Sequence, residues 1–338
     1  MKAVILAAGR GTRMQGLCDD LPKPLLPIAN RPVLAHTLGQ LEAAGVTEAL
    51  LIIGHMAHII TSALGSRCGG VALRYAVQSD PKGTGQAAAL AESFAAGEPF
   101  FLMFGDIVTS RRHIPDMLRI YAEERPAAAL SVRYFRDPAS GGAVYVEDDR
   151  VVRIVEKPKP GETTTHYINA GLFVFPPAIF DLLRQVRPSP RGEYELTDAI
   201  RMLLDAGQTV RAYDLTGFWV NITDPASYLE AHRELLAEGG CSGVGVPAGV
   251  EVRGPAALGE ACRLAPCQIG PNVSLGETCV VGRGAVLRDA IVMAGATIGA
   301  GARVESAIVG LGARVRDGVQ LIGDPDQRAA VVMHGELA

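Results

Sequence analysis

The feature that most constrains the fold is a six-residue period in the last third of the chain. From about residue 246, an apolar residue recurs at nearly every sixth position, and glycine often follows it. Hexapeptide repeats of this kind build a parallel β-helix, whose short strands pack their apolar residues into a shared prism. A glycine-rich loop has no reason to keep such a period. At about three hexapeptides per coil, the segment predicts roughly four coils. The apolar positions are Val252, Leu258, Leu264, Ile269, Leu275 and Val281, followed by Ile298, Val304, Val309, Val315 and Leu321.

The chain before about residue 235 follows a different pattern, in which apolar strand-like runs alternate with helix-like stretches. We expect strands at residues 2–6, 49–53 and 99–104, and an amphipathic helix at residues 32–44. Continuous apolar strands separated by helices predict a mostly parallel, Rossmann-like α/β sheet covered on both faces. In such sheets, ligands bind beyond the carboxyl ends of the strands.

The change of pattern predicts the domain organisation. We expect an α/β domain at residues 1–235, a linker at 236–245, a β-helix at 246–324 and a loosely held tail at 325–338. The pair Gly239-Gly240 marks the junction.

The composition limits the class of protein. The chain has 338 residues, of which 48% are hydrophobic and 20% charged, and its formal net charge is −4. This balance has too little positive charge for binding to a phosphate backbone, so we expect no nucleic-acid partner. No apolar run reaches the roughly 20 residues of a membrane span, and none resembles an export signal. We therefore expect a cytoplasmic protein without a membrane partner.

The cysteines show no CxxC pair and no histidine at zinc spacing. In a cytoplasmic protein we expect all six to be reduced. They are Cys18, Cys68, Cys241, Cys262, Cys267 and Cys279.

A glycine-rich turn follows the first predicted strand directly. In Gly9-Arg10-Gly11-Thr12-Arg13, glycines allow a tight turn that brings backbone N–H groups close to anionic oxygens, and Arg13 adds a cation suited to a polyphosphate. The turn is not a Walker A motif, and the third glycine of a dinucleotide fingerprint is replaced by Met14. Alone, the turn also fits a purely structural role.

Four further motifs point to phosphate and metal chemistry. Lys23 projects from a stiff Pro22-Lys23-Pro24 segment, where a lysine that is merely solvated has no need of such rigidity. Gly83-Thr84-Gly85 makes a second close-approach turn. Asp106 ends the third strand, where a divalent cation could bind. Trp219-Val220-Asn221 precedes Asp224-Pro225, which has the form of a helix N-cap followed by a first-turn proline.

Taken in order, these motifs resemble the nucleotide-diphospho-sugar pyrophosphorylases, the sugar-1-phosphate nucleotidyltransferases. The resemblance covers residues 1–235, and a left-handed β-helix appended to such a domain is also found in that family. It implies that a nucleoside triphosphate and a sugar 1-phosphate react to give a nucleoside-diphosphate sugar and pyrophosphate, with Mg²⁺ as cofactor. The matching segments are Leu6 to Met14, Leu21 to Pro24, Gly83-Thr84-Gly85, Gly105-Asp106, Glu156-Lys157-Pro158, Asn169-Ala170-Gly171 and Trp219-Val220-Asn221.

The resemblance also implies roles for single residues. Arg13 and Lys23 would be catalytic: Arg13 would neutralise the departing pyrophosphate, and Lys23 would bridge the α-phosphate and the sugar phosphate. Asp106 and Asn221 would hold the metal; many family members have Asp at the second position, and Asp224 is the alternative ligand. The nucleotide would be bound by Leu6, Ala7, Ala8, Gly9, Gly11, Thr12, Gln78, Gly83, Thr84, Gly105 and Asp106.

Two further implications concern specificity. Gln78 matches the residue that reads the base in uridylyl- and thymidylyltransferases, since a carboxamide matches the N3–H and carbonyl of a pyrimidine. This favours UTP, then dTTP. The sugar would be held by Gly142, Glu156, Lys157 and Asn169, although Glu156-Lys157 also fits a surface ion pair. Gly141 stands where many members have an aromatic residue, which leaves the sugar or cyclitol open.

The β-helix predicts self-association or a brace rather than a second activity. A hexapeptide-repeat acyltransferase would need a histidine among the repeats, and none of the seven histidines falls there: His36, His55, His58, His113, His166, His232 and His334. We expect a homo-oligomer. Other readings are a GTP- or ATP-using member acting on an unusual sugar or cyclitol phosphate, a non-catalytic regulatory relative, and a dinucleotide-dependent dehydrogenase. The presence of Arg13, Lys23 and Asp106 argues against the regulatory relative, and the missing GxGxxG against the dehydrogenase.

Overall fold

The computed structural model describes residues 1–135, 141–159, 161–239, 246–324 and 328–338. Residues 240–245 of the predicted linker lie outside the described residues, as does Cys241, whereas residues 236–239 belong to the helix Pro225–Gly239 and are not a linker. By their contacts, the residues form two compact units. Unit 1 contains residues 1–9 and 34–219, and unit 2 contains residues 10–33 and 220–338.

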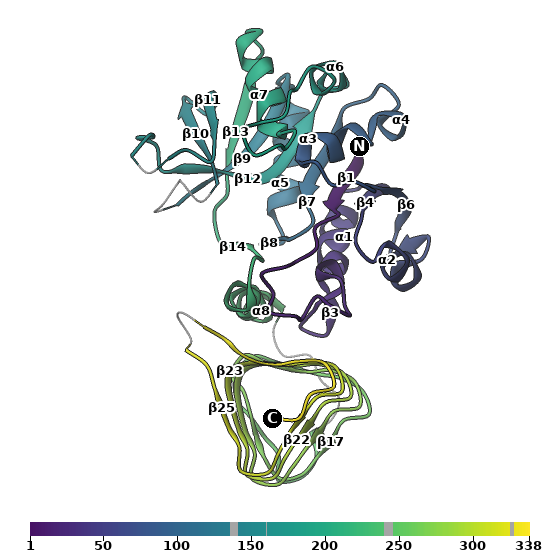
Figure 1. Ribbon diagram of the computed structural model, residues 1–338, viewed down its shortest axis with the longest axis vertical. Helices are drawn as coiled ribbons and strands as arrows, with labels where there is room; N and C mark the ends of the chain where they lie inside the picture. The colour runs from purple at the N-terminus through teal and green to yellow at the C-terminus, as the bar shows by residue number, and fades with distance from the viewer. Residues whose placement is uncertain (136–140, 160, 240–245, 325–327) are drawn as a thin grey trace. The chain divides into compact units, whose positions relative to one another are not determined.

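A ten-stranded sheet organises unit 1 (Figure 1). Its order is β10-β11-β13-β9-β12-β7-β1-β4-β6-β5. The central strands β7, β1, β4 and β6 are parallel neighbours, whereas β12 runs antiparallel to β7 and β9. The strands are β1 (Lys2–Ala7), β4 (Glu48–Ile53), β5 (Arg67–Cys68), β6 (Val71–Val77), β7 (Phe100–Phe104), β9 (Ala128–Tyr134), β10 (Gly142–Glu147), β11 (Arg150–Glu156), β12 (Tyr167–Phe175) and β13 (Val210–Asp214).

Helices cover this sheet because its central strands are apolar on both faces. Val4 and Ile5, neighbours that point to opposite faces of β1, are both fully buried. Helices α3, α4, α6 and α7 share one core with Val4, Leu50 and Leu102. The three predicted strands and the helix at residues 32–44 are confirmed within a residue or two. The helices are α1 (Val33–Ala43), α2 (Ala57–Leu64), α3 (Thr84–Ala89), α4 (Glu92–Ala95), α5 (His113–Glu124), α6 (Ile179–Leu183) and α7 (Leu196–Asp205); short strands are β8 (Ile107–Thr109) and β14 (Trp219–Asn221).

The C-terminal part of unit 2 is a stack of parallel strands with three sides, seen end-on as a triangle in Figure 1. Most strands pair with one that lies 17 or 18 positions further along the chain, as Glu251 does with Gln268 and Gln268 with Val286. Strands β23 and β26 are the exception among the described pairs, since Ala307 pairs with Ala330. This is the arrangement of a parallel β-helix. The strands are β15 (Glu251–Val252), β16 (Ala256–Leu258), β17 (Arg263–Leu264), β18 (Gln268–Ile269), β19 (Val273–Leu275), β20 (Val280–Val281), β21 (Val286–Val292), β22 (Thr297–Ile298), β23 (Arg303–Val309), β24 (Arg314–Val315), β25 (Gln320–Ile322) and β26 (Ala330–Val332).

The predicted apolar period fills the interior of this stack. Seven of its positions are buried: Ile269, Leu275, Val281, Ile298, Val304, Val309 and Val315. Val252, Leu258, Leu264 and Leu321 are only partly buried, because they belong to the end coils, which have a neighbour on one side only.

The expectation of a loosely held tail is wrong for residues 328–338. Strand β26 pairs in parallel with β23, and Val332 is 2% exposed. Strands β25 and β26 both pair with β23, so the chain completes the coil that begins at β25 beyond the predicted end at residue 324. His334 lies in this coil, which corrects the expectation that no histidine falls among the repeats. Its Nδ1 accepts a hydrogen bond from the Leu311 N–H at 2.9 Å, and its Nε2 lies 3.1 Å from the Leu17 carbonyl oxygen.

Residues 10–33 pack with the β-helix and with α8 (Pro225–Gly239). This segment carries the 3₁₀ turn η1 (Lys23–Leu25) and the short hairpin of β2 (Pro27–Ile28) and β3 (Arg31–Pro32). The hydroxyl of Tyr228, fully buried in α8, donates to the Pro27 carbonyl. Arg233 of α8 forms two hydrogen bonds with Asp289 in β21, at 2.6 and 2.9 Å.

Within the described part of the chain, none of the helices combines the length and apolar character that crossing a bilayer requires. The five described cysteines are free thiols.

Candidate active site

The carboxyl end of β1 is closely flanked by backbone in unit 1. The Gly105 N–H donates to the Leu6 carbonyl at 2.8 Å, and a Cβ added at Gly105 would lie 2.9 Å from the Ala7 Cβ. A Cβ at Gly54 would meet the Ala8 carbonyl at the same distance. Glycine is therefore required on both sides of residues 6–8, and Asp106 follows at the same strand end, half-buried.

Gln78 is 6% exposed and lies at the end of β6. Its amide nitrogen donates to Gln86 Oε1 at 2.8 Å and to the Gly83 carbonyl at 3.2 Å. Both donors are therefore used within the protein, which leaves the Gln78 carbonyl oxygen as the acceptor for a ligand. Gln86 was not predicted, and it fixes the orientation of the Gln78 amide.

The second glycine turn packs on the backbone before α7. Gly83 has φ +108°, and a Cβ there would lie 2.6 Å from the Tyr194 carbonyl oxygen. Gly85 donates its N–H to that same oxygen at 2.8 Å. The Thr84 hydroxyl accepts a hydrogen bond from the Leu196 N–H at 3.1 Å. These contacts explain why residues 83–85 are glycine-rich, independently of any ligand.

Three of the four predicted sugar residues come together in unit 1. Gly142 and Glu156 are cross-strand partners in β10 and β11, and a Cβ at Gly142 would lie 3.2 Å from Glu156 Oε2 and 3.6 Å from the Asn169 Cβ. Asn169 Oδ1 accepts from the Gly171 N–H at 2.9 Å, so its NH₂ group supplies donors. Lys157, the fourth, is exposed.

Sequence reasoning missed the partners of Glu156. The Thr197 hydroxyl donates to Glu156 Oε2 at 3.0 Å, and Arg191 lies 3.7 Å from Glu156 Oε1. Arg191 pairs more closely with Glu195, at 2.7 Å. Burial raises the pKa of Glu156 above its usual 4.5, the Thr197 hydrogen bond opposes that rise, and the neighbouring Glu195 adds to it. The surface-pair interpretation of Glu156 with Lys157 therefore gives way to a partly buried carboxylate that accepts a hydrogen bond from Thr197.

In unit 2, the catalytic candidates lie on residues 10–33. Gly11 has φ +69°, and a Cβ there would lie 2.8 Å from the Cys18 sulfur, so the turn needs glycine. Thr12 and Arg13 are exposed, and Arg13 forms no ion pair within the described part of the chain.

Lys23 is only 9% exposed, so it is not a solvated surface lysine. Its ammonium group donates to the Ile222 carbonyl at 2.9 Å. The lysine is thus held in unit 2 beside the residue that follows Asn221.

Asn221 carries a buried polar atom without a partner. Its Oδ1 has no hydrogen bond to any described residue. An acceptor left unpaired in this way costs about 1–3 kcal/mol, unless a bound ion satisfies it. An amide oxygen is a ligand that Mg²⁺ accepts. The residue present at position 221 therefore fits a metal ligand.

Asp224, the alternative ligand, is committed to helix α8. Its Oδ1 accepts from the Ser227 N–H at 2.9 Å, and its Oδ2 accepts from the Thr223 hydroxyl at 3.1 Å. Burial acts to raise the pKa of Asp224, but the hydrogen bonds from Ser227 and Thr223 outweigh it and lower the pKa. Asp224 is therefore a helix cap, as its Asp-Pro sequence predicted.

Among the described residues, no group of three or more His, Cys, Asp or Glu side chains is placed to hold a metal ion. This excludes a cage built only from such protein ligands in that part of the chain. It is compatible with Mg²⁺, which is commonly held by one or two protein ligands, substrate phosphates and water.

Comparisons with known proteins agree with this geometry. The nucleotidyl transferase family matches residues 2–238, and the GMPPB C-terminal domain matches residues 252–333. A glucose-1-phosphate thymidylyltransferase of Streptomyces griseus is 33% identical over 325 residues, which cover 90% of each chain. A protein of Oryza sativa subsp. japonica named "Probable mannose-1-phosphate guanylyltransferase 1" is 32% identical, covering 88% of this chain and 82% of its own.

A solved structure shows the same fold. The crystal structure of a UDP-glucose pyrophosphorylase complexed with UDP-glucose superimposes with a TM-score of 0.65 at 20% identity, over 70% of this chain and 98% of that one. The chain therefore belongs to the nucleotidyl transferase family and is an enzyme of the sugar-1-phosphate nucleotidyltransferase type.

Proposed function

We propose that this enzyme joins a nucleoside triphosphate, with UTP favoured and dTTP next, to a sugar 1-phosphate and releases pyrophosphate. The observation that carries the proposal is the position of the Lys23 ammonium in unit 2, beside the residue that follows Asn221. A buried ammonium is fixed to the Ile222 carbonyl, directly after an amide oxygen that lacks a partner. A fixed cation, bound to the residue next to a potential metal ligand, suits a reaction between two phosphates.

The proposed reaction is an in-line displacement. An oxygen of the sugar phosphate forms a bond to the α-phosphorus, and the bond from that phosphorus to the bridging oxygen of pyrophosphate breaks. A phosphomonoester has a second pKa of about 6, so the nucleophile is largely ionised at neutral pH. No general base is required, and the protein supplies positioning and charge neutralisation.

Each charged residue has a proposed part. Lys23 offsets the repulsion between the two phosphates as they approach. Arg13, exposed and free of ion pairs within the described residues, neutralises the departing pyrophosphate. Asp106 and Asn221 are proposed ligands of Mg²⁺, which would supply further neutralisation of phosphate charge. Residues 6–12 and Gly105 would approach the nucleotide by backbone, together with Gly83 and Thr84.

The nucleotide preference rests on Gln78. Because its NH₂ group is held by Gln86 and Gly83, its carbonyl oxygen would accept from the N3–H of uracil or thymine. The two relatives above carry names that refer to different nucleotides, so the base is assigned from this side chain. A GTP- or ATP-using enzyme acting on an unusual sugar or cyclitol phosphate is the alternative.

A Gln78→Glu substitution is expected to raise the KM for UTP at least tenfold. The carboxylate cannot donate to Gln86 Oε1 and would place a negative charge beside another acceptor, at a cost comparable to a lost hydrogen bond of 1–3 kcal/mol. Steady-state kinetics with UTP would measure the effect, and the melting temperature would report on folding. Unchanged UTP kinetics in a folded variant would refute the base-reading role.

The sugar is proposed to lie against Gly142, Glu156 and Asn169, with Lys157 reaching its phosphate. The ionised Glu156 would accept hydrogen bonds from ring hydroxyls. Asn169 would donate through its NH₂ group. Because Gly141 and Gly142 carry no side chain, several sugars or cyclitols would fit beside them, and the identity of the sugar stays open.

The role of Glu156 predicts a pH effect on sugar affinity. Its raised pKa means that it becomes protonated at a higher pH than an ordinary Glu, and a protonated carboxyl is a weaker acceptor. At pH 8, Glu156→Gln is expected to raise the KM for the sugar phosphate about tenfold, because a hydrogen bond to a charged group is worth about 1.5–3 kcal/mol. The ratio of the two KM values should shrink as the pH is lowered from 8 and Glu156 takes up a proton. Because the wild type and the variant use the same sugar phosphate, titration of the substrate affects both KM values and cancels in their ratio.

The exposed Glu147, on the same strand as Gly142, gives a matched control. Glu147→Gln should leave the KM unchanged at every pH. A Glu156→Gln enzyme whose KM matches the wild type at pH 8 would exclude Glu156 from the sugar site.

For the domain organisation, we propose a catalytic region at residues 1–235 and a left-handed β-helix at 246–324, extended by residues 328–338. The predicted linker at 236–245 is wrong for residues 236–239, which belong to helix α8. The β-helix is proposed to brace the segment that carries Lys23. Asn30 donates to the carbonyls of Ala257 and Leu275, and His334 lies against the Leu17 carbonyl. Residues 10–33 thus contact both the first coils and the last coil of the β-helix.

The β-helix is also proposed to form a homo-oligomer. Light scattering should then give a mass for the full chain that is a multiple of 35.5 kDa. Deleting residues 240–338 should reduce the assembly. If the protein is a monomer before and after the deletion, the β-helix has no assembly role, and its support of the segment that carries Lys23 is the role that remains.

The experiment that tests the function is pyrophosphate release with Mg²⁺. UTP, dTTP, GTP, CTP and ATP are crossed with a panel of sugar 1-phosphates and cyclitol phosphates. Release that requires both substrates is expected, and it would name both. No release from the folded protein across the panel would overturn the proposal in favour of a non-catalytic relative.

A further inference from the structure

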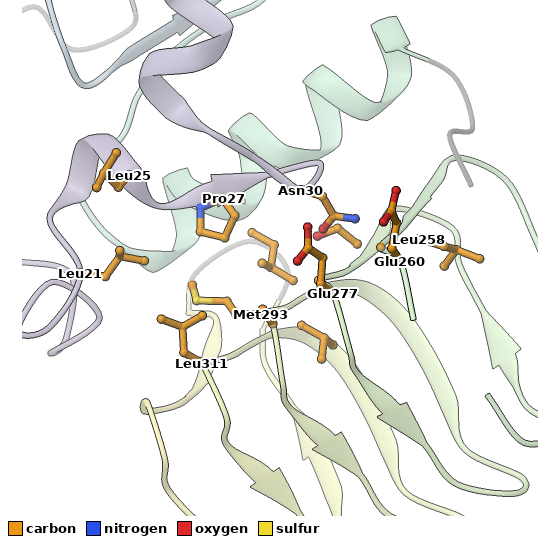
Figure 2. Close-up of a pocket in the computed structure, with 15 residues that line it drawn as sticks. Leu21, Leu25, Pro27, Asn30, Leu258, Glu260, Glu277, Met293 and Leu311 are labelled. Carbon is orange, nitrogen blue, oxygen red and sulfur yellow. The ribbon is translucent and has the colours of Figure 1, made fainter. Parts of the chain in front are cut away.

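A cavity of about 650 Å³ lies within unit 2, between residues 21–30 and one corner of the β-helix (Figure 2). The volume is in the range of small-molecule sites, which are mostly apolar with a few placed polar groups. Neither Arg13 nor Asn221 lines it. The cavity is therefore separate from the residues proposed for catalysis.

One wall of the cavity is a column of residues from successive coils. Glu260, Glu277, Ala294 and Leu311 occupy equivalent corner positions: the Thr278 N–H donates to the Glu260 carbonyl, and the Gly295 N–H to the Glu277 carbonyl. The column is acidic in its first two coils and apolar in the next two. Charge and apolar surface are thus separated along the cavity.

The facing segment repeats this separation. Leu21 and Leu25 lie at the end with Met293 and Leu311, whereas Asn30 lies at the end with Glu260 and Glu277, as Figure 2 shows. The Asn30 NH₂ group already donates to Ala257 and Leu275, so its oxygen remains as an acceptor.

The polar groups of the lining suit a ligand that donates hydrogen bonds. Ser274 is 1% exposed, lines the cavity and has no hydrogen-bond partner for its hydroxyl among the described residues. The fifteen lining residues include two carboxylates and no Lys, Arg or His. Neither Glu260 nor Glu277 forms an ion pair within the described part of the chain. Both glutamates lie in turns at the corner and are exposed, so their carboxylates are available to a cationic ligand.

We propose that this cavity binds an amphipathic organic cation, with an ammonium or guanidinium group between Asn30 and the two glutamates and an apolar body against Met293, Leu311, Leu21 and Leu25. The ligand acts as an effector, because the wall it contacts carries Lys23 between Leu21 and Leu25. This second statement rests on the proposed function, whereas binding does not.

Binding is tested with 4-phenylbutylammonium, 4-phenylbutanol and 4-phenylbutyrate on the full chain by calorimetry, without substrates. The ammonium should bind at least tenfold more tightly than the alcohol, and the carboxylate most weakly. The expected tenfold ratio of the Kd values corresponds to about 1.4 kcal/mol of binding free energy. Equal Kd values for the three compounds, or no binding up to about 10 mM, would overturn the proposal.

Variants locate the site. Glu260→Gln/Glu277→Gln should reduce the ammonium to the affinity of the alcohol, and Ala294→Trp, which fills the exposed middle of the column, should abolish binding of both. Glu251→Gln, which removes a carboxylate from β15 outside the cavity, should change nothing. Ammonium binding that persists in the double variant would place the site elsewhere. If Ala294→Trp instead changes the mass by light scattering, a second copy covers the cavity and the proposal is wrong.

The effector role has its own readout. At saturating 4-phenylbutylammonium, kcat should change at least twofold in the wild type and not in Ala294→Trp. Binding without any change in kcat would overturn the effector role alone. The calorimetry needs no transferase activity. Failure of the proposed function can therefore be distinguished from failure of ligand binding to the cavity.

Discussion

A Lys23→Met enzyme is expected to lose about 10²- to 10³-fold in kcat while remaining folded. Losses of this size follow when one preorganised group that stabilises transition-state charge is removed. Lys23 is preorganised because it is buried and its ammonium is fixed at 2.9 Å from the Ile222 carbonyl. The KM for the triphosphate should change less than kcat, since the charge that Lys23 offsets is greatest when the two phosphates meet. Steady-state kinetics at saturating substrate would measure both.

A structural effect must be separated from the catalytic one. Methionine leaves the Ile222 carbonyl without its donor, which costs about 1–3 kcal/mol of stability. Lys2 offers a matched control, because its ammonium also donates to a backbone carbonyl, that of Phe94, at 2.7 Å. Lys2→Met should cost similar stability and leave kcat unchanged. If both variants lose activity in proportion to their melting temperatures, Lys23 only supports the fold.

The parts of the fold that were predicted correctly are those governed by local periodicity. The continuous apolar run at residues 49–53 predicts a strand buried on both faces, and β4 is such a strand. The six-residue period predicts the interior of the β-helix, as the buried Ile269 and Val304 show. Periodicity failed where the sequence departs from it: the six-residue spacing stops after Leu321, so the continuation of the last coil into β26 could not be recognised.

The packing of residues 10–33 with the β-helix had no signal in the sequence. It depends on tertiary contacts such as the Asn30 hydrogen bonds to Ala257 and Leu275, which join positions more than 220 residues apart. An asparagine between two short strands predicts only a turn. The segment could therefore be assigned to phosphate chemistry by its motif, but not to its structural neighbours.

The candidate site shows the same division. Glu156 and Asn169 were predicted because each belongs to a motif, and Gly142 was predicted from the family resemblance. Thr197 and Arg191 were missed because they reach Glu156 from α7 and the loop before it, where no motif marks them. The unpaired oxygen of Asn221 is a property of burial and geometry, which composition and spacing do not report.

An Asn221→Leu enzyme is expected to lose about 10²- to 10³-fold in activity and to be as stable as the wild type or more so. The activity falls because a metal ligand that positions phosphate charge is removed. The stability holds because the Asn221 Oδ1 is buried without a partner, and replacing such a group with an apolar one of similar size removes its desolvation cost. A residue that served only the fold would show the opposite pattern, with lower stability and unchanged kcat in the surviving folded fraction.

The assignment of the ligand is tested by varying the Mg²⁺ concentration. Asn221→Asp adds a negative charge to the ligand, so half-maximal activity should be reached at a lower Mg²⁺ concentration than in the wild type. Asp224→Ser removes the neighbouring carboxylate and retains a side chain that caps helices well, so it should leave the Mg²⁺ dependence unchanged. If Asp224→Ser instead raises the Mg²⁺ requirement and Asn221→Leu does not, Asp224 is the ligand. The unpaired oxygen of Asn221 would then be a cost of the fold without a role in catalysis.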